Sequence, residues 1–237
     1  VFSDDMITPL ASVLVNRLTG SRTIITRKMQ TPPSLTYEQK LKLDDLAERL
    51  IASEEPVTIL IDGHEAEISE YLIKKLPNAR VVMDGGSLRA SNIKLAAWTD
   101  YFVVSEHFAR DYMSYRSLST EAEIKAALIE LNKICRGEAF ITLGEKGCAF
   151  LKSGMLQIVP SWLCNAVDTT GAGDVFHGAF TYGVHYSWHI DNIILFASLT
   201  AAISIEKKGV RESMPDLAVV HHSLNSYERN LTQYFEE

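Results

Sequence analysis

Several features that mark particular protein classes are scarce or missing in this sequence. Its 237 residues include only three cysteines, Cys135, Cys148 and Cys164, with no C-x-x-C pair and no Cys/His cluster. This pattern gives no support for a zinc site or a disulfide-stapled fold, and we interpret the three as reduced thiols of a cytoplasmic protein. No apolar run approaches the ~20 residues of a membrane-spanning helix, and no signal or transit peptide is visible, so we expect no membrane partner.

Positive charge is also in short supply. The sequence has 23 Lys and Arg residues against 30 Asp and Glu residues, which gives a formal net charge of −7. Nucleic acids and anionic membrane surfaces are polyanions, so this balance argues against both as general partners. A small phosphorylated ligand remains compatible, since a local cluster of amides can bind one within an acidic protein. The length and the 46% hydrophobic content suffice for one large domain with a small appendage.

Two hydrophobic patterns alternate along most of the chain. Short apolar runs that end in a polar residue or glycine predict strands at Val57–Asp62, Val81–Asp84, Tyr101–Ser105 and Ala139–Gly144. Helical spacing of apolar residues predicts helices at Thr36–Ala52, Glu65–Leu76, Thr120–Arg136, Gly173–His185 and Ile190–Glu206. Thr120 and Glu123 fit a capping box at the start of the third of these helices. Apolar strands alternating with amphipathic helices predict an α/β fold with a parallel sheet covered on both faces.

Two predicted hairpins interrupt this alternation. One combines Ser12–Asn16 with Arg22–Arg27, and the other combines Cys148–Lys152 with Leu156–Val159. The segment Gln30–Ser34, which contains two prolines, is the best candidate for a hinge after the first hairpin. We therefore expect residues 1–33 to form a small β lid with its hinge and residues 34–237 to form the α/β core.

The chemistry is concentrated in the segment Asp168–Asp174, with the sequence Asp-Thr-Thr-Gly-Ala-Gly-Asp. A glycine-rich turn that enters a helix presents unpaired N–H groups, which together with the helix dipole form an anion site. Asp174 would lie in the first turn of that helix, where it can accept a proton from a substrate hydroxyl. It can equally be a simple helix cap, and spacing alone leaves both interpretations open. No G-x-x-x-x-G-K-S/T loop and no G-x-G-x-x-G after a strand occurs, which excludes a Walker-type loop and weakens a dinucleotide interpretation.

The run Asp168–Asp174, together with Val175–Phe180, resembles the second signature of the PfkB family of ribokinase-like carbohydrate kinases. Three further segments are similar to parts of the family pattern. Ile141–Cys148 is similar to the strand and glycine turn near the nucleotide, and Thr19–Ile24 is similar to a strand of the lid. Lys207–Val210 is similar to the segment that passes the nucleotide. The resemblance covers nearly the whole chain and is closest to the ketohexokinase-like and sulfofructose-kinase-like branches. It implies a three-layer α/β/α fold with a mostly parallel central sheet and a small β lid.

The resemblance implies an enzyme that transfers the γ-phosphoryl group of ATP, bound with Mg2+, to a hydroxyl of a small sugar. Asp174 would be the general base, and the amides of Gly171, Ala172 and Gly173 would form the anion hole. The implied nucleotide-binding residues are Thr142, Gly144, Gly147, Gly209 and Ser105. Asp168 and the Thr170 carbonyl would hold a monovalent cation such as K+.

Three residues are candidates for the substrate side of the site. Asp84 and His64 lie where predicted strands end, the position at which parallel sheets bind ligands, although both are also ordinary turn residues. Arg22 lies on the predicted lid hairpin and could contact a phosphate or sulfonate, although solvated strand arginines are commoner. His177 falls one helical turn after Asp174, where we expect it to pack rather than to transfer a proton.

The chain departs from the family pattern in two places. The family's Asn-x-x-Glu, which acts through magnesium and water, is matched by Ser105-Glu106-His107-Phe108, so that Glu106 is the remaining candidate for that role. The family's first strand, with its substrate-binding Asp and Gly-Gly-x-x-x-Asn segment, is not found, and we expect this chain to begin about a quarter of the way into the fold. A nucleoside kinase and a catalytically silent homologue therefore remain as alternatives, and a homodimer through the β lid is expected.

Overall fold

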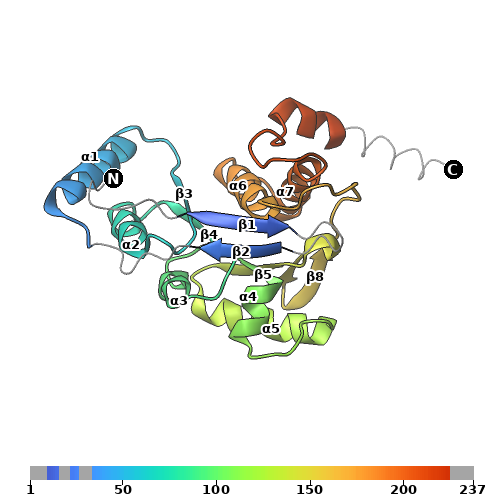
Figure 1. Cartoon of the computed structure of the whole chain (residues 1–237). Helices are drawn as coiled ribbons and strands as arrows, with labels where there is room; N and C mark the ends of the chain where they lie inside the picture. Colours follow the sequence, from blue (N-terminus) through green and yellow to red (C-terminus); the bar gives the residue numbers. More distant parts are fainter. Residues whose placement is uncertain (1–9, 16–21, 27–33, 225–237) are drawn as a thin grey trace.

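A six-stranded sheet forms the centre of the protein in the computed structural model, which describes residues 10–15, 22–26 and 34–224 (Figure 1). The strand order is β3-β4-β5-β6-β7-β8, with β3 to β6 parallel and the last two strands antiparallel. Their bounds are β3 Thr58–Ile61, β4 Arg80–Gly85, β5 Tyr101–Ser105, β6 Glu138–Thr142, β7 Cys148–Lys152 and β8 Met155–Val159. The mostly parallel sheet confirms the predicted α/β class.

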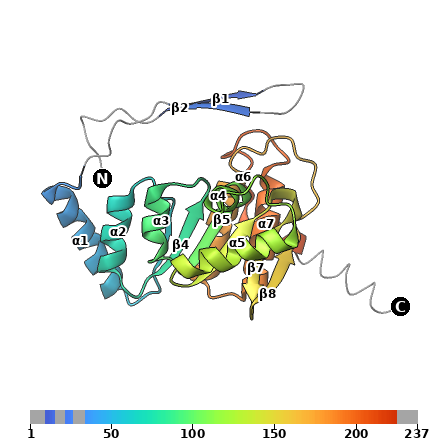
Figure 2. The same ribbon diagram turned by 90° about the horizontal axis from the view of Figure 1, so that it is seen from below.

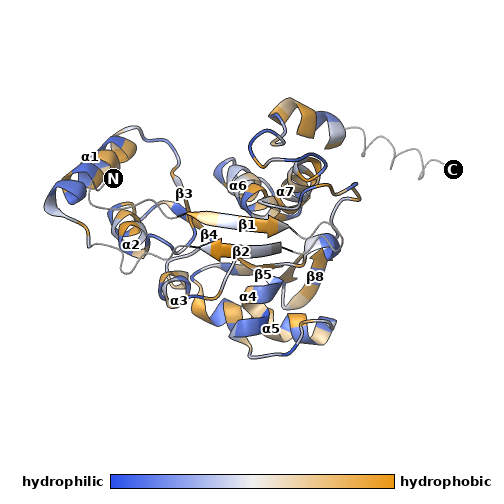
Figure 3. Cartoon of the chain, viewed as in Figure 1, coloured by the Kyte–Doolittle hydropathy of each residue, from blue (hydrophilic) through white to orange (hydrophobic). Residues whose placement is uncertain are grey.

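Helices cover both faces of the sheet, as continuous apolar strands require. One face is covered by α2 Ala66–Lys75, α3 Ala90–Ala96, α4 Glu106–Tyr112 and α5 Glu121–Ile134. The other is covered by α6 Ala172–His185 and α7 Ile190–Ser204, and α1 Tyr37–Ala52 packs beside α2. Figure 3 shows hydrophilic and hydrophobic residues together along α1 and α5, as expected of helices with one face on the core.

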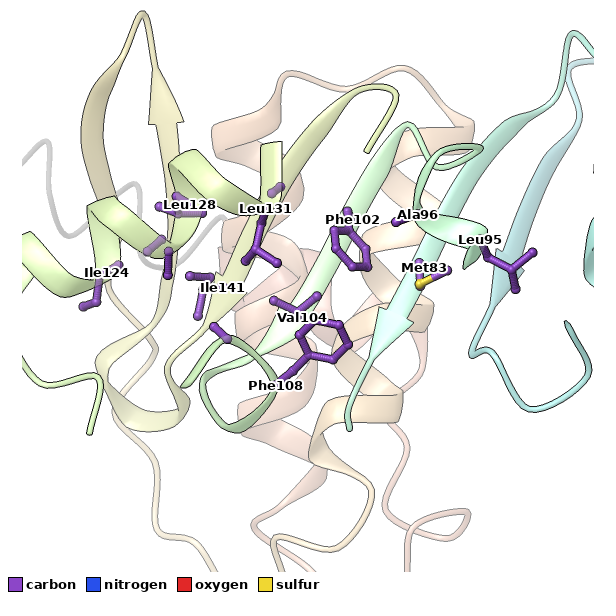
Figure 4. Packing of buried hydrophobic residues seen from close by; sticks show 14 of the residues in the cluster. Met83, Leu95, Ala96, Phe102, Val104, Phe108, Ile124, Leu128, Leu131 and Ile141 are labelled. Atoms are coloured by element: carbon purple, nitrogen blue, oxygen red, sulfur yellow. The ribbon is translucent and has the colours of Figure 1, made fainter. Parts of the chain in front are cut away.

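The two faces of the sheet are built from alternating residues of the same strands. Val81 and Met83 of β4 join the core cluster on the α2–α5 side, and Val82 between them joins the cluster against α6 and α7. Figure 4 shows Met83, Phe102, Val104 and Ile141 of three neighbouring strands on the first side. Because side chains of a strand alternate between faces, the next residue of β4, Asp84, points towards α6.

All predicted strands and helices are present, with ends within a few residues of those expected. Two seven-residue helices, α3 and α4, were missed because two turns are too short to establish a helical period. The second hairpin is confirmed, and its strands β7 and β8 extend the main sheet through the antiparallel pair β6 and β7. No helix in the described ranges is long and apolar enough to cross a membrane.

The first hairpin is confirmed as the antiparallel pair β1 Ala11–Val15 and β2 Arg22–Thr26, which Figure 2 shows apart from the six-stranded sheet. Val13, Leu14 and Ile25 on its strands are 41%, 57% and 56% exposed. The predicted hinge at Gln30–Ser34 falls outside the described residues except for its last position, as do Thr19 to Ser21 of the lid segment.

The three cysteines lie apart from one another in the described structure and form no disulfide there. All three are free; Cys148 is buried, and Cys135 and Cys164 are half-buried. Burial raises the pKa of the Cys148 thiol to about 12 and that of Cys135 to about 11. Neither is therefore ionised near neutral pH, as a nucleophile or metal ligand would need to be.

The predicted capping box at the start of α5 is confirmed. The Thr120 hydroxyl accepts a hydrogen bond from the Glu123 N–H at 3.2 Å, and the Glu123 carboxylate accepts from the N–H groups of Thr120 and Ser119, each at 2.9 Å. These bonds, led by the one from the Thr120 backbone, lower the pKa of Glu123 below its usual 4.5. The ionised form is thus favoured by the folded state.

We predict that Glu123→Gln lowers the free energy of unfolding at pH 7 and has a shrinking effect in acid. A carboxyl with a depressed folded-state pKa stabilises above its unfolded pKa, and this contribution is lost as pH falls through 4.5 towards the lower folded-state pKa. Urea unfolding at several pH values measures the difference. Glu121→Gln removes a first-turn charge of the same helix without touching the box; equal pH dependence in both variants would contradict the prediction.

Candidate active site at the carboxyl edge of the sheet

Polar residues gather where the parallel strands end. Asp62 follows β3, Asp84 lies near the end of β4, and Ser105 ends β5 directly beside Thr142 of β6. Open α/β sheets bind their ligands outside this carboxyl edge. The residues that the sequence placed after separate strands therefore do share one edge, as predicted.

The start of α6 has the glycine turn and the uncapped helix end on which the predicted anion site depends. The N-cap residue is Gly171, with a left-handed φ of 75° and no side chain to satisfy the first N–H groups of the helix. A Cβ on Gly171 would lie 2.6 Å from Val210 Cγ1, whereas a Cβ on Gly173 would meet no atom within 4 Å. The Ala172 N–H already donates to Thr169 O, at 3.4 Å. Gly171 is needed for the turn, and Gly173 leaves open space in which an anion can approach the backbone.

Asp168 holds this turn in place. Its Oδ1 accepts a hydrogen bond from the Thr170 N–H at 3.0 Å, and its Oδ2 accepts from the Gly209 N–H at 3.4 Å. Gly209 itself has a φ of 87°. Asp168, Thr170 and Gly209, predicted separately as cation and nucleotide residues, thus lie together next to the glycine turn.

No group of three or more His, Cys, Asp or Glu side chains within the described parts of the chain is arranged to hold a metal ion. Glu106, the first residue of α4, and the cation site at Asp168 and Thr170 remain predictions.

Asp174 lies in the first turn of α6 and is exposed, as a group that meets a substrate must be. Burial raises the pKa of nearby Asp84, the charge of His177 opposes the rise, and the charges of Asp174 and Asp62 raise it further. The three carboxyl groups are therefore close enough to interact. A carboxyl group with a pKa perturbed by burial and by neighbouring charges is typical of functional sites.

Ser105 is engaged in structural bonds. Its hydroxyl accepts from the Phe108 N–H at 3.0 Å as the N-cap of α4 and donates to Gly86 O at 2.9 Å. Phe108, which matches the Glu of the family's Asn-x-x-Glu, is fully buried with its ring 5.6 Å from that of Phe102. The position that supports magnesium in the family pattern is therefore part of the hydrophobic core here (Figure 4).

The predicted nucleotide turn connects β6 to β7. Thr142 donates from its hydroxyl to Val104 O at 3.4 Å, and Gly144 opens a short 3-10 helix with a φ of 60° and no atom near its absent Cβ. Gly147 has a φ of 102°, and a Cβ there would lie 2.0 Å from Val159 O. Gly147 is thus required by the packing of β8, and Gly144 faces open space that a ligand can enter.

The two remaining substrate candidates are His64 and Arg22. His64 is exposed, and its N–H donates to Asp62 Oδ1 at 2.9 Å, which is the turn role that the sequence left open. Arg22 lies on β2, opposite Val15 in the hairpin. Both assignments remain predictions.

A family model, that of the pfkB family carbohydrate kinases, matches residues 85–217, which run from the last residue of β4 to the segment after α7 and contain Asp168–Asp174. This chain belongs to the pfkB family. It is 29% identical over 189 residues to a ribokinase of Lactococcus lactis, an alignment that covers 80% of this chain and 60% of that relative. The chain therefore spans less than two thirds of the length of this pfkB relative.

Solved structures of pfkB relatives share the fold. A ribokinase from Giardia lamblia has a TM-score of 0.74 at 21% identity, covering 93% of this chain and 72% of the other. An Arabidopsis thaliana ribokinase, complexed with ribose and ATP, has a TM-score of 0.69 at 21% identity, covering 90% of this chain and 67% of the other. These likenesses confirm the ribokinase-like α/β architecture.

Proposed function

We propose that this chain carries the nucleotide-binding core of an ATP-dependent kinase that phosphorylates a hydroxyl group of a small sugar. The observation that carries the proposal is the pairing of an open helix start at Gly171–Gly173 with the exposed carboxylate of Asp174, at the carboxyl edge of the sheet. Phosphoryl transfer needs little covalent participation by the protein, and positioning with charge stabilisation accounts for most of its catalysis.

Each part of this arrangement has a role in the proposed reaction. Asp174 accepts the proton of the attacking hydroxyl, and the N–H groups at the start of α6 donate to the oxygens of the transferred phosphoryl group. Asp168 fixes the turn that carries those N–H groups. Mg2+ bound with ATP would supply further neutralisation of the phosphate charge.

The pfkB relatives guide the choice of sugar. The Lactococcus lactis relative is a ribokinase, and the Arabidopsis structure contains ribose and ATP. We propose a pentose or a ketose as acceptor, with residues 34–237 as the nucleotide-binding core and residues 1–33 as lid and hinge. The exposed apolar residues Val13, Leu14 and Ile25 on the two-stranded hairpin support our proposal that two lids pair in a homodimer.

An assay of ADP release across ribose, deoxyribose, ketoses, sugar phosphates and nucleosides tests the function. We expect ATP-dependent turnover with at least one sugar and none with nucleosides. Turnover with nucleosides alone would show a nucleoside kinase. Measurable ATP binding without turnover on any acceptor would show a catalytically silent homologue, and either outcome would overturn the proposal.

A further inference from the structure

His177 lies one turn after Asp174 on α6, and its side chain is only 4% exposed. Its Nδ1 is 2.7 Å from Gly173 O and 3.3 Å from Asp84 Oδ2, and its Nε2 is 3.2 Å from Val103 O. The ring therefore contacts the first turn of its own helix and two neighbouring strands. Asp84 and Val103 are direct partners in the register of β4 and β5, so both contacts come from one point on the sheet.

The partners of the ring favour one arrangement of its hydrogens. The carbonyl oxygens of Gly173 and Val103 carry no hydrogen and can only accept, so a hydrogen bond to each requires an N–H on both ring nitrogens. A neutral imidazole has one N–H and would direct the lone pair of its other nitrogen at a carbonyl oxygen. An imidazolium satisfies both contacts, and the Asp84 carboxylate at 3.3 Å supplies the opposite charge that a buried cation needs.

The charged groups around the ring are consistent with this assignment. Asp84 is the ion-pair partner of His177 from β4, with its own side chain 18% exposed, and the charges of Asp62 beyond β3 and Asp174 on α6 act on Asp84. The alternation of side chains along β4 explains why Asp84 meets α6 at all.

We propose that His177 is a positioning residue which, as a buried imidazolium paired with Asp84, fixes the first turn of α6 on the ends of β4 and β5. It thereby holds Asp174 and the anion-binding N–H groups in the geometry that the reaction needs. This proposal rests on the proposed kinase function. It assigns Asp84 as the counter-ion of His177 in place of the substrate role that the sequence suggested.

Nitrogen-15 spectroscopy of the imidazole rings tests the protonation state without any assay of activity. In the wild-type protein near pH 7 we expect the two ring nitrogens of His177, identified by their loss in His177→Gln, both to carry hydrogen. In Asp84→Asn the ring should lose one of them, because its counter-charge is gone. A ring with one N–H in the wild-type protein would overturn the proposal, whether or not the protein proves to be a kinase.

Kinetics of the two single variants and their combination test the positioning. Asp84→Asn removes the counter-charge, so that the neutral ring keeps only one of its two hydrogen bonds, and we expect kcat to fall by about 10²-fold, the loss that a small misplacement of reacting groups can cause. Adding His177→Gln replaces the ring by a neutral side chain with two N–H donors that needs no counter-charge, so the double variant should recover part of this loss. Additive losses would overturn the pairing, and an unchanged kcat in Asp84→Asn would overturn the positioning role.

Discussion

Asp174→Asn is expected to lower kcat for sugar phosphorylation by about 10²- to 10⁴-fold, the usual contribution of a general base. The amide keeps the size of the side chain and its place in the first turn of α6, but it cannot accept the proton of the attacking hydroxyl. The affinity for ATP should stay nearly unchanged, because the N–H groups of the turn remain. Steady-state kinetics together with calorimetric titration of ATP measure the two quantities separately.

Asp191→Asn is a matched control for this prediction. Asp191 is likewise a carboxylate in the first turn of a helix, α7, where it is half-buried and pairs with Lys152 at 3.1 Å and with His189 at 3.2 Å. If removing charge from a helix start were all that mattered, the two variants would lose similar activity. A near-normal kcat in Asp174→Asn would show that Asp174 is not the base.

Phe180→Ala is expected to lower the free energy of unfolding by about 3–5 kcal/mol, the cost of truncating a large buried aromatic residue. Phe180 is fully buried on α6, with its ring 5.3 Å from that of Phe140 and 5.8 Å from that of Tyr101. These rings hold the helix that carries Asp174 against the sheet. Truncation should therefore leave both a cavity and a less firmly seated active-site helix.

Equilibrium unfolding in urea measures this loss, and Tyr37→Ala is the control. Tyr37 begins α1 and is 76% exposed, so its truncation should change the free energy of unfolding by about 0.5 kcal/mol or less. A similarly small effect of Phe180→Ala would mean that the cluster between the sheet and α6 is not tightly packed.

Features encoded in short stretches of sequence were predictable. Strand β5 was predicted with its exact bounds, and the Thr120–Glu123 capping box was identified. Each depends only on residues that are close together in the sequence. The glycine turn before α6 and the first-turn place of Asp174 followed from glycine spacing before a helical pattern; the left-handed φ of Gly171 is added by the structure. Local chemistry of this kind can be inferred without knowing what packs against it.

Features that depend on distant residues were not predictable from pattern. His177 was expected only to pack, and its burial agrees with that, but its bond to Val103 joins residues 74 apart in the chain. Asp84 was placed at a strand end, yet nothing in its surroundings in the sequence indicates a histidine partner on α6. The short helix α4 is capped by Ser105, but Phe108 stands where a capping box has Glu or Gln. The sequence at its start therefore lacks one of the two residues that mark a helix start.

The bond from Gly209 to Asp168 has a consequence for synthesis of the protein. It joins residues 41 apart, and the neighbour that occupies the space beside Gly171 is Val210. A nascent chain that has emerged only as far as α6 thus contains the glycine turn without the contacts that hold it. Since domains fold as units, the proposed phosphate site should form late, when the ribosome has released the segment after α7.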